Sequence, residues 1–326
     1  MRRRHLWLAA ALPMAAPLAS RAQPAFPDRP LRLIVPFAAG TSSDIQGRLV
    51  AVRMGEVLGQ PIVVENRAGG GGTVGAEAVA KARPDGHTLL LGSNGPLTVN
   101  PVIQPRLPYD VETELAPIAL VSRSPLTLAV KADSPIRSLG DLVAAARARP
   151  GEITIGSSGQ GSATHFLIEQ FMAAAGIRLT HVPYRGSSQS IPDLIAGNVQ
   201  VVMGEVSTTV PTWRGGLVRI LATTGPDRTP LVPDIGTLIE QGYPGLTGGS
   251  WAALMTTGGT PEAAIRALAA AANAALADPT YRERQAEVGA QLSEAAVRSP
   301  AGLAAWLREE RARTRATAAQ AGIRGE

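Results

Sequence analysis

The sequence predicts an α/β fold with parallel strands, divided into two lobes. Apolar runs of strand length alternate with stretches of helical period over residues 31–94, and the same alternation returns over residues 153–204. The expected strands are continuous apolar runs, which is typical of parallel strands covered on both faces by helices. Two such units in a chain of 326 residues favour two lobes.

The first unit has the order β-α-β-α-β. Strands are expected at residues 31–37, 61–66 and 88–94. A helix is expected to begin at Ser43, because Gln46 three residues later completes a capping-box pattern, and to end at Gly59. A second helix is expected over residues 74–82. If the strand order is 2-1-3, a ligand binds beside the loops that follow the first and third strands.

The second unit repeats this order. Strands are expected at residues 153–158, 179–184 and 199–204. Helices are expected from Ser162 to Gly176 and over residues 188–196. Two extended segments, 117–131 and 218–225, are expected where the chain crosses between the lobes.

The remaining residues, 226–326, are expected to be largely helical. One helix is predicted to open at Thr260-Pro261 and another at Ser299-Pro300, since a polar cap followed by proline is a common helix start. These helices are expected to pack on the first lobe. We therefore assign residues 23–122 and 224–326 to lobe 1 and residues 123–223 to lobe 2.

The first 22 residues have the pattern of a secretory signal peptide. A basic start at residues 2–4 precedes a short apolar run and a small-residue ending at residues 20–22. The pair Arg3-Arg4 leaves both the general and the twin-arginine export routes open. We expect cleavage before Gln23 and a soluble periplasmic protein.

The composition excludes several classes of function. Removal of residues 1–22 takes away four arginines and no acidic residue, which leaves 27 Lys and Arg against 26 Asp and Glu. A chain so nearly neutral, without a basic patch, is not expected to bind nucleic acid. There is no cysteine, and only three histidines follow residue 22, so thiol catalysis is excluded and neither a metal nor a cofactor is expected.

The glycine run at residues 69–75 has the G-x-G-x-x-G spacing of dinucleotide-binding loops. In a dinucleotide-binding unit the glycines follow the first strand, and an acidic residue ends the second. Here they follow the second strand, and the next strand ends in Ser93-Asn94 without a carboxylate. We interpret the run as a turn into a helix N-terminus and expect the ligand site elsewhere.

Two other loops have the composition of anion-binding sites. Residues 36–44 and 156–165 each lead from a strand end through small residues into a helix N-terminus, and residues 92–97 follow the third strand. Free backbone N–H groups and the helix dipole attract an anion without a lysine. Facing each other across a hinge, these loops predict a cleft for a small anion.

Several longer segments resemble a known family. They include "LRLIVPFAAGTSSD", "GQPIVVENRAGGGGTVGAEAVAKARPDGHTLLLGSNG", "GSSGQGSATH" and "VPYRGSSQSIPDLIAGNVQ". Together they are similar to the Bug family, the TctC-like extracytoplasmic solute-binding receptors of tripartite tricarboxylate transporters. The resemblance covers the chain after residue 22 in order.

The resemblance implies a type II periplasmic-binding-protein fold, with two lobes that are each a mostly parallel sheet flanked by helices and are joined by two hinge crossings. It implies a small organic acid as ligand and membrane transporter subunits as transient partners. We expect a monomer.

The resemblance also implies which residues line the cleft. In such receptors backbone N–H groups, hydroxyls and bridging waters of the facing loops hold a carboxylate. The corresponding positions in the first lobe are Phe37, Ala39, Gly40, Ser42, Asp44, Ser93 and Asn94. Those in the second lobe are Ser157, Ser158, Gly159, Ser162, His165, Tyr184, Arg185, Ser187 and Glu205.

Some of these residues have two interpretations. Asp44 either contacts the ligand or complements the helix N-terminus and pairs with Arg48. His165 either contacts the ligand or bonds the local backbone. Arg185 either clamps a carboxylate or is a solvated loop cation.

Two positions depart from the family pattern. Thr41 replaces the second of two glycines, and Gly204-Glu205 stands where the family often has Asp-Asn. The threonine changes the backbone path of the loop or adds a hydroxyl. Glu205 either selects an amine-bearing ligand or faces solvent.

Two other functions remain open. The same binding fold serves as the input of a membrane sensor kinase. An exported hydrolase is the third alternative, although residues 156–159 do not complete a G-x-S-x-G nucleophile elbow and nothing in the sequence orients a histidine toward a serine.

Overall fold

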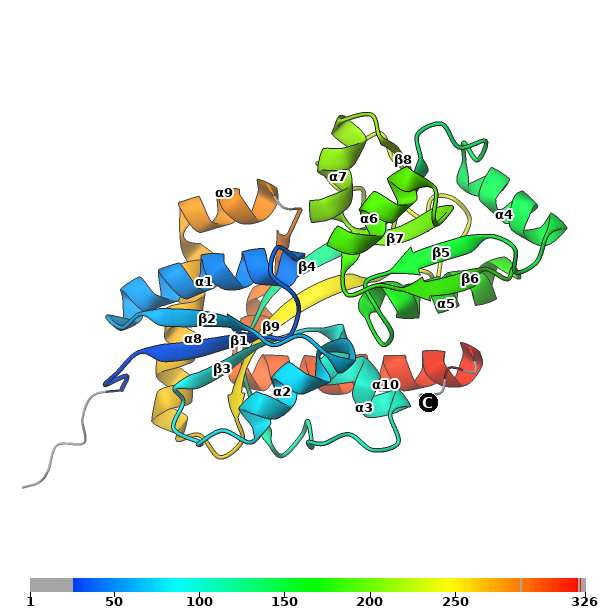
Figure 1. Cartoon of the computed structure of the whole chain (residues 1–326). Coiled ribbons are helices and arrows are strands. Elements are labelled where there is room, and N and C mark those ends of the chain that lie inside the picture. The colour runs from blue at the N-terminus through cyan, green and yellow to red at the C-terminus, as the bar shows by residue number, and fades with distance from the viewer. Residues whose placement is uncertain (1–25, 288, 322, 324–326) are drawn as a thin grey trace, which may run out of the picture.

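The computed structural model describes residues 26–287, 289–321 and 323. They form two lobes, one coloured blue, cyan and orange and the other green in Figure 1. The predicted signal peptide, residues 1–22, lies outside the described residues.

The sheet of the first lobe has the order β2-β1-β3-β9-β4. Strand β1 (Leu31–Val35) pairs in parallel with both β2 (Ile62–Asn66) and β3 (Thr88–Gly92), which confirms the predicted 2-1-3 order. Strand β9 (Gly249–Thr257) is antiparallel to β3 and to β4 (Leu115–Lys131). The loops after β1 and β3 therefore leave the same edge of the sheet side by side.

The second lobe repeats this arrangement. Strand β5 (Thr154–Ser157) lies in parallel between β6 (Thr180–Pro183) and β7 (Val201–Glu205). Strand β4 is antiparallel to β7 and to β8 (Val218–Thr223). Each lobe therefore has three parallel strands, as predicted, and antiparallel strands toward the hinge, so the sheet as a whole is mixed.

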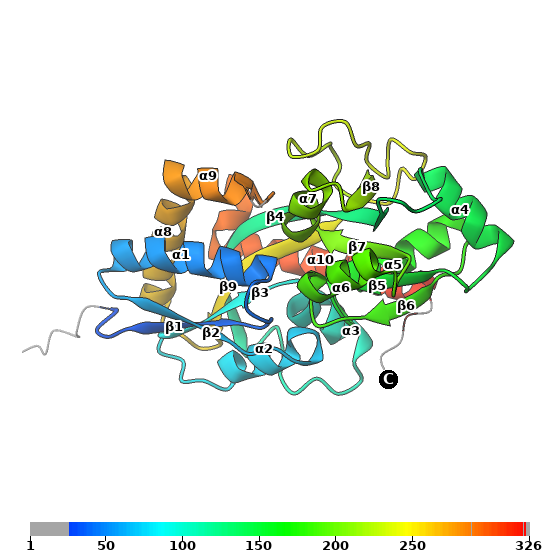
Figure 2. The ribbon, with the colours of Figure 1, turned by 45° about the horizontal axis from the view of Figure 1, so that its top comes forward.

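Helices cover both faces of each sheet (Figure 2). In the first lobe one face carries α1 (Ser42–Leu58), α8 (Glu262–Ala277) and α9 (Pro279–Glu287), and the other carries α2 (Thr73–Ala80) and α10 (Pro300–Ala321). In the second lobe one face carries α4 (Leu139–Ala148) and α5 (Ala163–Ala175), and the other carries α6 (Ser187–Ala196) and α7 (Val206–Arg214). Short elements complete the chain: η1 (Gly70–Gly72), η2 (Gly95–Val99), α3 (Asn100–Ile103), β10 (Gln291–Leu292) and η3 (Ala295–Arg298).

The hinge is built around β4, which pairs with β9 in the first lobe and with β7 and β8 in the second. After β8 the chain stays with the second lobe, because Leu238 and Leu246 belong to the buried cluster that contains Leu128 and Phe171. The predicted lobe boundary at residue 224 stays a prediction, and this packing favours a return to the first lobe at the start of β9.

Two details of local structure differ from expectation. The C-terminal region contains the helices α8, α9 and α10, and it also contains β9, a central strand of the first sheet that was not expected. Its sequence "GSWAALMTT" is buried along nearly its whole length, and a fully buried strand carries no alternation to reveal it. Helix α1 is capped by Thr41 rather than Ser43: the Thr41 hydroxyl accepts the Asp44 N–H.

Candidate functional site

The loop after β1 exposes the N-terminus of α1. Thr41 precedes the helix, and its hydroxyl accepts a hydrogen bond from the Asp44 N–H at 3.4 Å. The Ile45 N–H donates to the Thr41 carbonyl. The cap leaves the N–H groups of Ser42 and Ser43 without an intrahelical acceptor, because the first turn of a helix has none to offer. These two groups are available to an anion.

Asp44 holds this loop in shape. One carboxylate oxygen accepts the Gly40 N–H at 3.0 Å, and the other accepts the Asn66 amide at 2.9 Å. Arg48 forms an ion pair with Asp44 at 3.0 Å. Burial works to raise the pKa of Asp44, but the hydrogen bonds from Arg48, Gly40 and Asn66 together lower it below its usual value. Both oxygens are engaged, which favours the structural interpretation of Asp44 over ligand contact.

The remaining first-lobe side chains are also engaged within the protein. The Ser42 hydroxyl accepts the Gln46 amide at 3.0 Å, and Gln46 in turn accepts a hydrogen bond from Ser122 on β4. The Asn94 side chain clamps the start of β9, since its amide donates to the Gly249 carbonyl and its carbonyl accepts the Trp251 N–H, each at 3.2 Å.

The other first-lobe candidates offer backbone rather than side-chain groups. Phe37 is partly buried, and its carbonyl accepts the Asn66 amide at 3.1 Å. Ala39 and Gly40 are exposed. Ser93 is buried behind the loop that follows β3. The Gly40 N–H already donates to Asp44, so in this lobe the Ser42 and Ser43 N–H groups are the donors left without a partner within the helix.

The second-lobe loop repeats the cap of the first. The Ser162 hydroxyl accepts the His165 N–H at 3.2 Å, and the Phe166 N–H donates to the Ser162 carbonyl. The N–H groups of Ala163 and Thr164 are again left at the open end of the helix. His165 is buried, and its Nδ1 accepts the Gly161 N–H at 3.2 Å. The local interpretation of His165 is the one that this geometry favours.

A serine–histidine contact lies behind this loop. Ser157 Oγ is 2.6 Å from His181 Nε2, and the His181 ring stacks on His165 with centroids 4.1 Å apart. Burial and the neighbouring His165 lower the pKa of His181 to about 4. The expectation that nothing orients a histidine toward a serine was therefore wrong. Ser157 is nonetheless fully buried and accepts the Gly159 N–H, so a substrate does not reach its hydroxyl.

The carboxyl group of Glu205, the last residue of β7, accepts hydrogen bonds from two serine hydroxyls. Ser158 Oγ donates to one oxygen of Glu205 at 2.8 Å, and Ser187 Oγ donates to the other. The two serine oxygens are 2.9 Å apart. Burial raises the pKa of Glu205, and the hydrogen bond from Ser158 works against that shift. Glu205 therefore faces its own lobe's hydroxyls rather than open solvent.

The loop after β6 supplies Tyr184 and Arg185. The Tyr184 hydroxyl donates to Asp193 at 2.7 Å, and burial together with that carboxylate raises the pKa of Tyr184 to about 12. Arg185 is exposed, and its backbone N–H donates to the side-chain carbonyl of Gln189 at 3.3 Å. Arg185 is the one cation among the predicted site residues.

The two lobes enclose a cavity of about 960 Å³, here called the front cavity. Of the predicted residues it gathers Phe37 from the first lobe and, from the second, Ser158, Gly159, Tyr184 and Arg185. Its other walls include Gly69–Gly72, Asn100 and Arg106. The ligand site was expected away from the glycine run, and this stays a prediction, although the run lines the same cavity as the predicted loops.

The reason lies in the sheet. Strand β2 is parallel to β1, so the loop that follows it leaves the same edge. A Cβ atom on Gly71 would lie 2.7 Å from the Gln160 carbonyl of the second lobe, so the lobes approach closely only because a glycine stands there. Loops that follow neighbouring parallel strands leave the same edge of the sheet. This rule would have identified Gly69–Gly72 and Asn100 as residues that line the front cavity.

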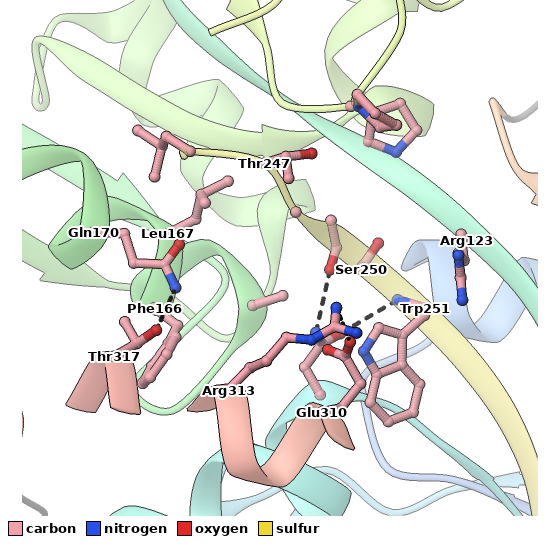
Figure 3. A pocket seen from close by; sticks show the side chains of 18 of the residues that line it. Arg123, Phe166, Leu167, Gln170, Thr247, Ser250, Trp251, Glu310, Arg313 and Thr317 are labelled. Carbon is pink, nitrogen blue, oxygen red and sulfur yellow. Dashed lines mark hydrogen bonds and ion pairs between the residues drawn. The ribbon is translucent and has the colours of Figure 1, made fainter. Parts of the chain in front are cut away.

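A second cavity, of about 1330 Å³, lies beside the hinge between α5 and α10 and is here called the hinge cavity (Figure 3). Gln170 of α5 donates to Thr317 of α10 at 3.3 Å and so links the lobes. Arg313 forms an ion pair with Glu310 at 2.9 Å. Among the predicted site residues, Asn94 lines this hinge cavity. It therefore lies apart from the predicted residues that line the front cavity.

Two negative findings apply to the described part of the chain. No three His, Cys, Asp or Glu side chains within residues 26–287, 289–321 and 323 gather closely enough to hold a metal ion. No helix among these residues is long and apolar enough to cross a membrane.

The chain is similar to known proteins of one family. Residues 47–318 match the family model described as "Tripartite tricarboxylate transporter family receptor", TctC. Protein BugT of Bordetella pertussis is 37% identical over 278 residues, which cover 85% of this chain and 84% of BugT.

Two solved structures share the whole architecture. The R. palustris protein Rpa4515, solved with adipate, has a TM-score of 0.87 and 33% identity over 92% of this chain and 99% of its own. MatC (Rpa3494) from Rhodopseudomonas palustris, solved with bound malate, has a TM-score of 0.84 and 32% identity over 90% and 99%.

Proposed function

The chain belongs to the tripartite tricarboxylate transporter receptor family, and on that premise we propose that it captures one small carboxylate between its lobes and delivers it to a membrane transporter. It is a solute-binding protein of the periplasmic-binding-protein fold. We further propose that it works in the periplasm as a monomer, after export by the signal at residues 1–22.

The observation that carries the proposal is the repeated helix cap. Thr41 and Ser162 each bond the third N–H of their helix, and each leaves the first two N–H groups at the open end. Both helix ends lie at the edges where β1 and β5 terminate. A carboxylate is the small anion that two sets of backbone N–H groups and two helix dipoles suit without a lysine.

Contact between the facing loops supports capture by closure. A Cβ atom on Gly186 of the second lobe would lie 3.1 Å from Thr41 Cγ2 of the first, and Gly71 approaches the Gln160 carbonyl in the same way. A solute held between these loops would be shielded from water on both sides. Such enclosure strengthens its hydrogen bonds and ion–dipole interactions.

This geometry does not support catalytic turnover of a substrate. The serine nearest to a histidine, Ser157, has no exposed surface. A nucleophile needs its hydroxyl within reach of the reacting carbonyl as well as of a base. Stoichiometric, reversible binding needs neither.

The test is a ligand screen on the purified chain without residues 1–22. Carboxylates of two to eight carbons, including malate and adipate, are screened by thermal shift, and each positive compound is titrated by calorimetry. We expect a rise in Tm and a stoichiometry of one. A chromogenic ester turned over by the protein, with no carboxylate raising Tm, would refute the proposal.

A further inference from the structure

The second lobe has four serines that were predicted to hold the solute, and the hydroxyls of all four are engaged inside the lobe. Ser157 contacts His181, and Ser162 caps α5. Ser158 and Ser187 both donate to Glu205. The hydroxyls that would receive a solute carboxylate on this side already bind a carboxyl group of the protein.

Glu205 is placed to act as that group. It is the last residue of β7 and directly precedes α7, and its two donors come from the loop after β5 and from the start of α6. Ser158 also lines the front cavity, so the carboxyl to which it donates lies one hydrogen bond away from the space where the solute is proposed to bind. Both carboxyl oxygens of Glu205 accept serine hydroxyls, and Ser158 is the residue through which this group meets the cavity.

No basic side chain of the described residues forms an ion pair with Glu205. The charged or titratable groups on the surrounding elements are engaged elsewhere: His181 with Ser157, Tyr184 with Asp193, and Asp44 with Arg48. Arg185, on the loop before α6, and Arg106 are exposed cations that line the front cavity. A carboxyl without a counter-charge favours a neighbour that donates a hydrogen bond or carries a positive charge, and disfavours a second carboxylate.

We propose that Glu205 is a built-in carboxyl that occupies the hydroxyl donors of the second lobe, so that this receptor selects carboxylates whose far end donates a hydrogen bond over dicarboxylates. The inference rests on the proposed function of carboxylate capture. The solute's single carboxylate binds the free backbone N–H groups, and its far end, an ammonium or an amide, donates to Glu205. A dicarboxylate would bring a second anion to a carboxyl group that has no cation beside it.

The experiment compares solutes of matched length that differ at one end. The four-carbon set is succinate, succinamate and 4-aminobutyrate, and the six-carbon set is adipate, adipamate and 6-aminohexanoate. Each is titrated into the chain without residues 1–22 by calorimetry at pH 7.5. In the set that binds better, we expect the solute with an amide or ammonium end to bind at least about tenfold more tightly than the dicarboxylate. This is the range that a hydrogen bond to a charged group provides.

The matched variant is Glu205→Gln, which keeps the shape of the side chain and removes its charge. We expect the preference for the ammonium-ended solute to fall below about twofold, and dicarboxylate binding to strengthen by about tenfold. The control is Glu152→Gln, the same change on an exposed second-lobe residue that pairs with Arg149 on the surface. It is expected to leave the preference unchanged, and thermal melts of both variants verify that they fold.

The outcomes separate the two proposals. A wild-type protein that binds a dicarboxylate more tightly than its donor-ended partner overturns the role of Glu205 and leaves carboxylate capture intact. The same holds if Glu205→Gln keeps the wild-type preference. If no carboxylate in these sets or in the wider screen binds, carboxylate capture itself is refuted and this inference with it.

Discussion

The two lobes have the same strand order and the same helix cap, yet the neighbours of their buried carboxyl groups shift the pKa in opposite directions. In the first lobe Asp44 is compensated by Arg48, Asn66 and the Gly40 N–H, which lower its pKa. In the second lobe Glu205 accepts two serine hydroxyls and pairs with no cation among the residues that the structure describes, and burial raises its pKa. A shared topology therefore sets where a polar group lies, while its nearest neighbours decide its charge.

This difference assigns different tasks to the lobes. In the first lobe the carboxylate fixes the loop and leaves only backbone N–H groups for the solute. In the second lobe the carboxyl is bonded to Ser158, which lines the front cavity. We infer that the first lobe provides a backbone anion site and the second lobe sets the preference among solutes.

The largest expected effect compares the two carboxyls directly. Asp44→Asn places an amide N–H against donors on Gly40, Asn66 and Arg48, so we expect the free energy of unfolding to fall by about 2–3 kcal/mol. Glu205→Gln removes a charge that no cation compensates, and we expect a change below about 1 kcal/mol. Urea denaturation of both variants measures this, and equal losses would contradict the comparison.

A smaller effect is expected from acid. The pKa of His181 is lowered from 6.5 to about 4, so its neutral form stabilises the fold above pH 6.5, and this stability is lost as the pH falls toward 4. We expect the loss to be on the order of 1–2 kcal/mol after allowance for solvent screening at a partly exposed ring. Asp44 loses its stabilising effect only at lower pH. Its pKa is lowered in the folded protein, so the ionised carboxylate stabilises the fold until the pH falls below about 4.

The measurement is urea denaturation between pH 7 and pH 4, with hydrogen exchange to separate the lobes. The segment 154–184 is expected to lose protection before the segment 31–66. His181→Gln should flatten the pH dependence. Glu205→Gln should steepen it, because the raised pKa of Glu205 contributes stability at low pH that is lost as the pH rises. Unchanged slopes in both variants would remove the electrostatic difference between the lobes.

The smallest expected effect concerns lobe contact. Gly186 has a φ of 147° and lies against Thr41, whereas Gly197 at the end of α6 has a φ of 83° and nothing within 4 Å of a Cβ atom. Alanine at either position should cost about 1 kcal/mol of stability, because both conformations are strained for an L side chain. Only Gly186→Ala should also weaken solute binding, by about threefold to tenfold, since its methyl group opposes closure. Equal affinities for the two variants would show that this contact does not form in the bound protein.

Much of the architecture was predictable because it depends on local patterns. The strands β1, β2, β3, β5, β6 and β7 each fall within an apolar run that the sequence shows, or within one residue of it, and glycine ends α1, α5 and α6 where expected. Strand β9 was missed because burial on both faces removes the alternation that identifies a strand.

The site was predictable as a set of loops and not as a set of contacts. The loops after β1 and β5 border the front cavity, and Ser158 and Tyr184 are among its lining residues. Asn94 lines the hinge cavity instead, and Ser157 and Ser162 are engaged within their own lobe. A side chain's partners come from segments far away in the sequence, so no pattern around Asn94 shows that it holds Gly249.

The sequence by itself determined the family, the two α/β units and the loops that face each other, because apolar period, helix caps and glycine positions are local properties of the chain. Only the tertiary structure decided which hydroxyls are free, that the glycine run shares the front cavity, and that Asp44 has a cation while Glu205 has none. Charge and hydrogen-bond partners depend on neighbours brought together by folding, so the local sequence around a residue does not determine them.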